Sequence, residues 1–334
     1  MKHFRKTAFL LCAALFVLAL ISLCLGRYAV PPTDVLRILA SRFVPVAETW
    51  ETGMEAAVLS IRPPRILLAA LVGACLSIAG ASYQGVFRNA MAAPDFLGAS
   101  SGAAFGAALA ILLGLSSASI TVSAFCFSLL TVALVFFAAR RAPGKRAANL
   151  ILAGIMISSL FSSATSYLKL IADPSSKLPE ITYWLMGSFS GKTWHDVRFA
   201  LPFMLLGTVP LLLLRWRMNL LTMGDDEARA MGVDANKLRL LVVVCATLVT
   251  AASVSVSGVI GWVGLVVPHM ARRIAGSDYR RLLPTALLLG ALFLLAADDL
   301  CRCLLAVEIP IGILTSFLGA PFFLLLMLKR EASL

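Results

Sequence analysis

Long apolar runs recur along the whole chain and constrain its fold more than any other feature. A helix needs about 20 apolar residues to cross a bilayer, and in lipid its backbone groups must be satisfied within the helix itself. The pattern therefore predicts an all-α polytopic membrane protein with about ten transmembrane helices. The runs, separated by polar or basic clusters, lie near residues 7–26, 64–84, 96–114, 117–139, 148–170, 197–214, 238–257, 259–271, 283–300 and 311–328.

Two of these runs allow other interpretations. The first has a basic start, as a signal peptide does, but the stretch from Thr7 to Leu25 has no A-x-A-like cleavage site. We therefore interpret it as the first crossing. The eighth run is short for a full crossing, and Pro268 lies near its end.

The composition excludes several classes of protein. Of the 334 residues, 60% are hydrophobic and 14% are charged, whereas soluble domains have about 45–50% and 25%. A soluble enzyme, a disordered chain and a disulfide scaffold are excluded. The seven cysteines lie in or beside apolar runs without the paired spacing of a zinc site, so no metal site is predicted. A redox or metal pair at Cys301 and Cys303 is the alternative.

The distribution of charge predicts the orientation of the helices. With the N-terminus in the cytoplasm, 19 of the 29 basic residues and seven acidic residues fall on the inner side. The outer side keeps ten of each sign, so the whole net charge of +12 lies inside. Cytoplasmic loops are enriched in Lys and Arg. The count predicts that both termini are cytoplasmic, and it removes the reason to expect a nucleic-acid partner.

Small residues recur at fourfold spacing in three of the runs. Because lipid provides no hydrophobic drive for helix association, such stripes allow helices to pack closely. We expect close contacts along the first two stripes. The third is rich in hydroxyls, which either bond to carbonyls four residues earlier or line a hydrated path for a polar solute. The stripes are Gly73, Ser77, Ala81 and Gly85; Gly98, Gly102, Gly106, Ala110 and Gly114; and Gly154, Ser158, Ser162 and Ser166.

A polar segment between two apolar runs, Arg215 to Arg239, contains the sequence of a short helix. Its first turn is acidic, which suits the positive end of a helix dipole, and Gly232 is a plausible C-terminal stop. Ala228 and Met231, three residues apart, form a small apolar face. The segment is either a solvated loop with a helical turn or a docking helix for a cytoplasmic partner.

No catalytic constellation accompanies these features. The three histidines (His3, His195 and His269) lie in different parts of the chain, and His269 is expected to have a structural role. The segment 187–193 resembles a phosphate-binding loop, but only three residues separate its glycines where four are required. We predict a chain that is not an enzyme and binds no nucleotide or other cofactor of its own.

An ordered set of motifs covers nearly the whole chain. It resembles the permease subunits of ABC importers for iron–siderophore, haem and cobalamin, called FecCD-type or BtuC-like. One departure is Asp299, a second acid after Asp298. The main motifs are Arg62-Pro-Pro-Arg65, Arg88-Asn89 through Pro94 to Gly98, Ala228-Arg229-Ala-Met-Gly232, Gly258 through Gly264 to His269, Ala297-Asp298 with Arg302, and Glu308-Ile-Pro310.

The resemblance implies the architecture of a type II ABC importer permease, with residues 1–334 as one transmembrane domain. It implies a cytoplasmic coupling segment at about 219–238, an inner loop at 140–147, and outer loops at about 28–61 and 171–193. It also implies a bacterial cytoplasmic (inner) membrane. The partners would be a second permease copy forming a homodimer, membrane lipid, two ATPase subunits that use ATP and Mg, and an extracytoplasmic binding protein.

The resemblance also assigns roles to residues. Arg62, Arg65 and Arg302 would meet acidic residues of the binding protein, since a guanidinium pairs bidentately with a carboxylate. The alternatives are interfacial anchoring for the first two and an ion pair with Asp298 for Arg302. The Ser stripe would line the pathway. The residues of the coupling helix would be Gly224, Asp225, Asp226, Glu227, Ala228, Arg229, Met231 and Gly232.

Two other classes of protein remain open from the residues alone. An ion-coupled secondary transporter would place ionisable groups near the membrane midplane, but no run has an acid at its centre, and Asp298 and Asp299 lie at a predicted outer end. An intramembrane enzyme would need catalytic side chains clustered at one depth. The chelate carried by a permease of this type is not specified by these motifs.

Overall fold

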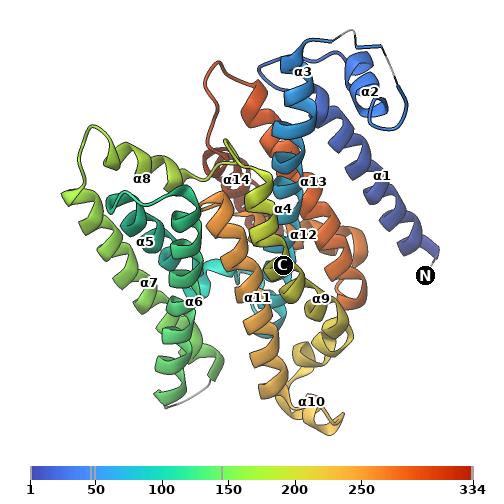
Figure 1. Ribbon diagram of the computed structural model, residues 1–334. Coiled ribbons are helices and arrows are strands. Elements are labelled where there is room, and N and C mark those ends of the chain that lie inside the picture. The colour runs from blue at the N-terminus through green and yellow to red at the C-terminus, as the bar shows by residue number, and fades with distance from the viewer. Residues whose placement is uncertain (1, 46, 49, 144–145, 332–334) are drawn as a thin grey trace.

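The computed structural model describes residues 2–45, 47–48, 50–143 and 146–331, and no β-strand occurs in this part of the chain. Helices dominate it (Figure 1). In chain order they are α1 (Lys2–Cys24), α2 (Pro32–Ala40), α3 (Thr52–Ala56), η1 (Ala57–Ile61), α4 (Arg62–Val86), η2 (Pro94–Leu97), α5 (Ala99–Leu112), α6 (Ser117–Arg141), α7 (Arg146–Ile171), α8 (Lys177–Met186), α9 (Trp194–Met223), α10 (Asp225–Ala230), α11 (Ala235–Ser257), α12 (Val263–Ala275), α13 (Tyr279–Cys303) and α14 (Ile311–Glu331).

Ten of these helices correspond to the ten apolar runs. Among the described residues, seven helices are long and apolar enough to cross a bilayer: α1, the continuous helix from α3 to α4, α6, α7, α9, α11 and α13. The shorter α5 and α12, together with α14, lie in the remaining runs. The all-α membrane fold predicted from hydropathy is confirmed.

The helix α5 is shorter than the apolar run near 96–114 predicts. It has 14 residues, a length of about 21 Å at 1.5 Å per residue, whereas the hydrocarbon core is about 30 Å thick. The 3₁₀ turn η2 precedes it, and Gly98 has a left-handed φ of 77°. The structure corrects the expectation of a full helical crossing here. Irregular backbone inside a membrane protein must be covered by protein, and Gly154 of α7 lies directly against the Phe96 carbonyl.

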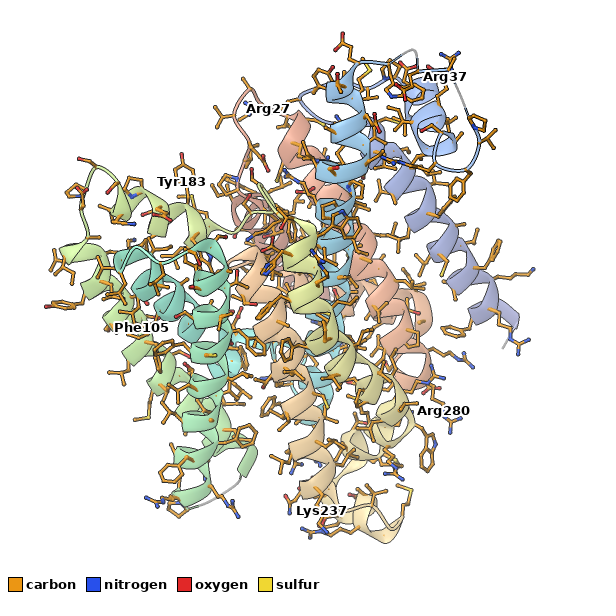
Figure 2. The ribbon with its side chains drawn as sticks, viewed as in Figure 1. Arg27, Arg37, Phe105, Tyr183, Lys237 and Arg280 are labelled. Atoms are coloured by element: carbon orange, nitrogen blue, oxygen red, sulfur yellow. The ribbon has the colours of Figure 1, made fainter. Side chains whose placement is uncertain are left out.

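The polar segments gather at the two ends of the bundle as the charge count predicts. In Figure 1, α10, the C-terminal end of α6 and the N-terminal end of α7 lie at one end of the bundle. The helices α2, α3 and α8 lie at the other end. Figure 2 shows Lys237 and Arg280 at the first end and Arg27, Arg37 and Tyr183 at the second. We call them the inner and outer ends. Of the predicted inner loop 140–147, residues 144 and 145 lie outside the described residues.

The helix α4 forms the centre of the bundle, in contact with α13, α11, α9 and α12. Its first small-residue stripe faces α13: a Cβ on Gly73 would overlap the backbone of Gly290, and one on Gly85 would lie 2.6 Å from the Tyr279 hydroxyl. A Cβ on Gly80 would overlap the carbonyl oxygen of Gly264 in α12. The expected close contacts are confirmed for this stripe.

The second stripe brings α5 against α6. A Cβ on Gly102 would lie 2.5 Å from the Phe127 carbonyl oxygen, and one on Gly106 would lie 2.6 Å from that of Ser123. Ser123 donates a hydrogen bond of 2.7 Å to the Gly106 carbonyl oxygen. Small residues let these backbones approach closely in lipid, so this stripe is also a helix contact.

Adding one methyl group at the α4–α12 crossing should be strongly destabilising. We expect Gly80→Ala to cost about 1–3 kcal/mol, because the methyl group overlaps backbone that has no rotamer to relieve it. The measurement is thermal unfolding of the purified chain in detergent. Gly261→Ala is the control, since a Cβ there has nothing within 4 Å. Equal melting temperatures for the two variants would contradict the close crossing.

Candidate functional site

The short helix predicted in the inner polar segment exists as α10, with three acids in its first turn. It ends where the sequence predicts. Gly232 has a left-handed φ of 77°, its amide donates to the Arg229 carbonyl, and the Val233 amide donates to the Ala228 carbonyl, both at 2.9 Å. These two bonds form a Schellman motif, which glycine favours because it lacks a Cβ. The segment is therefore a defined helix rather than an irregular loop.

Asp225 fastens α10 to the two central helices of the bundle. Its Oδ1 accepts hydrogen bonds from Arg88 at 2.7 Å and from Arg239 at 2.8 Å. Arg88 follows the end of α4 and also donates to the Leu221 carbonyl at 2.9 Å, while Arg239 lies on α11 and is 7% exposed. Charge-assisted hydrogen bonds thus connect α10 to both the end of α4 and α11.

The two residues of the predicted apolar face of α10 differ in exposure. Ala228 is fully buried in the main hydrophobic core. Met231 is 48% exposed, and the side chains of Asp226 and Arg229 are 93% and 59% exposed. These three side chains are among those that α10 and its C-terminal cap expose at the inner end.

The attachment of α10 to the bundle through Asp225 should not depend on pH near neutrality. Burial alone would raise the pKa of Asp225, but the hydrogen bond and charge of Arg239, with the charge of Arg88, lower it below its usual value. A lowered carboxyl pKa stabilises the folded state above the unfolded pKa of about 3.9, and this contribution is lost as the pH falls through the folded pKa.

We therefore expect α10 to resist proteolysis equally from about pH 5 to about pH 8, and to be released only at more acidic pH. Limited proteolysis between α9 and α11 measures this. In Asp225→Asn, the segment should be cleaved readily at every pH in the range. A segment in the unsubstituted chain that loosens between pH 6 and pH 8 would contradict the assignment.

A second charged cluster lies at the outer end, where α4 and α13 meet. Arg65 pairs bidentately with Asp298: Nη2 donates to Oδ1 at 2.8 Å, and Nε donates to Oδ2 at 3.0 Å and to Oδ1 at 3.2 Å. The Asp298 side chain is fully buried. Glu308, on the segment between α13 and α14, also pairs with Arg65 and is 22% exposed. Arg65 thus pairs with residues that are 233 and 243 positions away in the chain. These pairs join α4 to α13, and to the segment after α13, at the outer end.

The other two outer arginines hold the end of α1. Arg62, 5% exposed, donates to the carbonyls of Leu23 and Tyr28. Arg302, 6% exposed, pairs with Asp299 and lies 3.4 Å from Asp298. Asp299 also accepts a hydrogen bond from Ser22 of α1. Arg65 and Arg302 thus pair with acids, while Arg62 is satisfied by backbone carbonyls, and these partners allow so many charges to be buried.

This geometry bears on the roles expected for Arg62, Arg65 and Arg302. The ion pair of Arg302 with Asp298, held open as the alternative, is present. All three guanidinium groups have partners within the chain, and only Arg65, with 11% of its side chain exposed, reaches the surface appreciably. Two residues of these networks, Arg239 and Ser22, were not predicted from the sequence. A charged residue within a predicted span, as Arg239 is, requires a partner, and that signal was available.

The hydroxyl stripe of α7 divides into two parts. Gly154 is buried against η2, and Ser158 lies next to Gly98, so the inner half of the stripe is a helix contact. Ser162 and Ser166 are exposed on the described chain. The Ser166 hydroxyl donates to the Ser162 carbonyl at 3.0 Å. A hydrogen bond to the carbonyl four residues earlier and an exposed polar face therefore occur on the same helix. Only the outer half is available to line a path.

Comparison with known proteins places these features in a family. Residues 14–329 match the model of the FecCD transport family. The molybdate import system permease protein MolB of Haemophilus influenzae is 40% identical over 98% of this chain and 97% of its own length. The cobalamin import system permease protein BtuC of Halobacterium salinarum is 43% identical over 81% of this chain and 73% of its own. The hemin transport system permease protein HmuU of Yersinia pestis is 40% identical, covering 84% and 87%.

The fold agrees with these matches. A solved structure, described as an inward-facing conformation of an ABC transporter assigned to the metal-chelate type, superimposes with a TM-score of 0.87. It is 39% identical and covers 97% of this chain and 99% of that one. The resemblance found in the motifs is therefore confirmed over nearly the whole length. This chain is a multi-pass membrane protein and belongs to the FecCD transport family.

Proposed function

We propose that the chain is the permease subunit of an ABC importer that carries an iron chelate, such as an iron–siderophore, or the related haem or cobalamin, across the bacterial cytoplasmic membrane. Membership of the FecCD transport family supports a transport subunit driven by separate ATPases. The observation that carries the proposal is α10. It presents Asp226, Arg229 and Met231 at the inner end while Asp225 connects it to α4 and α11.

The coupling mechanism follows from those connections. Two cytoplasmic ATPase subunits, which use ATP and Mg, would each hold the exposed side of one α10. Their closure would displace α10, and the pairs of Asp225 with Arg88 and Arg239 would pass the movement to α4 and α11. Bistable packed elements convert small displacements into switches between two states. The pathway would then open at one end and close at the other.

The remaining partners are a second permease copy, forming a homodimer, and an extracytoplasmic binding protein. Exposed Ser162 and Ser166 on α7 support a pathway between the two copies, since hydroxyls and apolar surface suit a bulky cargo that must not be held tightly. For the binding protein, Arg65 is the best placed of the three arginines. Arg62 and Arg302, which are buried, would support Arg65 and α1 rather than make the contact themselves.

A second cargo class is favoured by one observation. The molybdate permease MolB matches 98% of this chain at 40% identity, a longer match than those of BtuC or HmuU. An oxyanion is therefore the alternative cargo. Both cargo classes suit a pathway without fixed charges on its exposed hydroxyl face.

The test is uptake into proteoliposomes that contain the permease, its ATPase and the binding protein. Iron–siderophore, haem, cobalamin and molybdate are supplied separately. We expect ATP-dependent uptake of one metal chelate, and binding of the same chelate by the binding protein alone. Uptake of molybdate only would show that the cargo is an oxyanion rather than a metal chelate. Uptake driven by an ion gradient without the ATPase would overturn the proposal in favour of a secondary transporter.

A further inference from the structure

The helix α1 is attached to the bundle mainly at its outer end. There Arg62 binds the carbonyls of Leu23 and Tyr28, and Ser22 binds Asp299. The outer half of α1 also packs against α13, whereas its N-terminal half stands apart from the other helices (Figure 1), and only 6% of the apolar window of α1 is buried. Because α1 packs mainly on α13 and much less on α4, a wedge is left between its outer half and the start of α4.

That wedge contains an apolar groove of about 610 Å³. One wall is the outer half of α1, from Cys12 to Leu23, and the opposite wall is η1 and the start of α4, from Val58 to Ala70. Leu39 of α2 closes it towards the outer end, and Trp194 of α9 also lines it. The volume lies within the range of about 300–1,000 Å³ that is typical of ligand pockets.

The depth of the groove corresponds to one leaflet of a bilayer. The stretch from Cys12 to Leu23 rises about 16 Å along the helix, and half of the hydrocarbon core is about 15 Å. Trp194, 42% exposed at the start of α9, lies at the outer end of the groove, where tryptophan is typical of the membrane interface. The groove therefore extends from the outer interface to the midplane.

The short helix α2 lies above the groove and has the character of an interfacial helix. Val35 and Ile38 of its inner face are buried, while Leu36 is 63% exposed. Its basic side chains, Arg37 and the following Arg42, are each ion-paired with an acid. A helix of this kind lies at the level of lipid headgroups. The groove itself is lined by apolar side chains, and charged side chains such as Arg37 lie at the outer end of the molecule (Figure 2).

We propose that this groove between α1 and α4 is a binding site for one acyl chain of an outer-leaflet phospholipid, with the headgroup beneath α2. Water cannot fill an apolar wedge at this depth, and an empty one loses the contacts of its lining. An extended hydrocarbon chain one leaflet long fits both the length and the chemistry. The lipid stays with the protein and acts as a spacer that sets the position of α1.

The test uses the full-length permease in nanodiscs of phosphatidylcholine with dibrominated oleoyl chains, which quench nearby tryptophan. The contribution of Trp194 is obtained as the difference from Trp194→Phe. Ala70→Phe fills the groove from α4, and Ala19→Phe fills it from α1 if the first variant does not fold. Ala14→Phe, at an exposed position of α1 outside the groove, is the matched control.

We expect strong quenching of Trp194 in the unsubstituted chain and in Ala14→Phe, and loss of most of it in a groove-filled variant. Native mass spectrometry after detergent extraction should find a retained phospholipid on the first two and none on the third. Equal quenching and retention in all variants would indicate freely exchanging surface lipid only. An unquenched Trp194 without retained lipid would indicate that no acyl chain occupies the groove. Either result would overturn the proposal.

Discussion

Replacing Asp298 with alanine should lower the free energy of unfolding by about 3–5 kcal/mol, the usual cost of removing one partner from a buried ion pair. Asp298 is fully buried and contacts both Arg65 and Arg302. In the variant, the guanidinium groups of Arg65 and Arg302 remain buried and desolvated, but the carboxylate that both of them contact is gone. The change should also loosen α1, because Arg302 helps to hold the carbonyl of Leu25.

Thermal unfolding in detergent, followed with a thiol-reactive dye, measures this effect. The buried thiols of Cys75 and Cys301 become reactive only when the chain opens. Glu308→Gln is the control, since Glu308 pairs with the same arginine from a position that is 22% exposed, and screening by solvent reduces what such a pair contributes. A melting temperature for Asp298→Ala equal to that of the control would contradict the buried network.

The second large effect is expected at α10. Met231→Asp should weaken binding of the ATPase by about thirtyfold, which corresponds to about 2 kcal/mol for a residue central to an interface. Met231 is 48% exposed, so its replacement should leave the melting temperature of the permease unchanged. ATP-driven uptake in proteoliposomes and co-purification of the ATPase should both be lost.

Two further variants make this result interpretable. Lys237→Ala changes another exposed side chain at the inner end, one that is 88% exposed, and should leave ATPase binding intact. Ala228→Asp places a charge in the core and should lower the melting temperature itself. If Met231→Asp retained full coupling with a folded permease, the assignment of α10 as the contact with the ATPase would fall.

The extent of prediction from sequence differs between the two ends of the molecule. At the inner end, the acidic first turn and Gly232 predicted a helix and its stop, and the Schellman bonds confirm both. Which of Ala228 and Met231 is buried could not be predicted, because a short alanine-containing helix has no hydrophobic pattern strong enough to specify its buried side. At the outer end, the pair of Arg302 with Asp298 follows from helical spacing, but Arg65 pairs with residues more than 230 positions away.

What the sequence determined by itself is whatever depends on local length and composition. Apolar runs of bilayer length must be helices in lipid, and the bias of basic residues sets which ends are cytoplasmic. The tertiary structure alone decided how deep each helix begins, as the 3₁₀ turn before α5 shows, and which charges meet across the bundle. It also decided that α1 packs mainly on α13 and leaves a groove beside α4. The reason is physical: hydropathy acts on each segment independently, whereas ion pairs and close helix crossings depend on how segments distant in the chain are arranged in space.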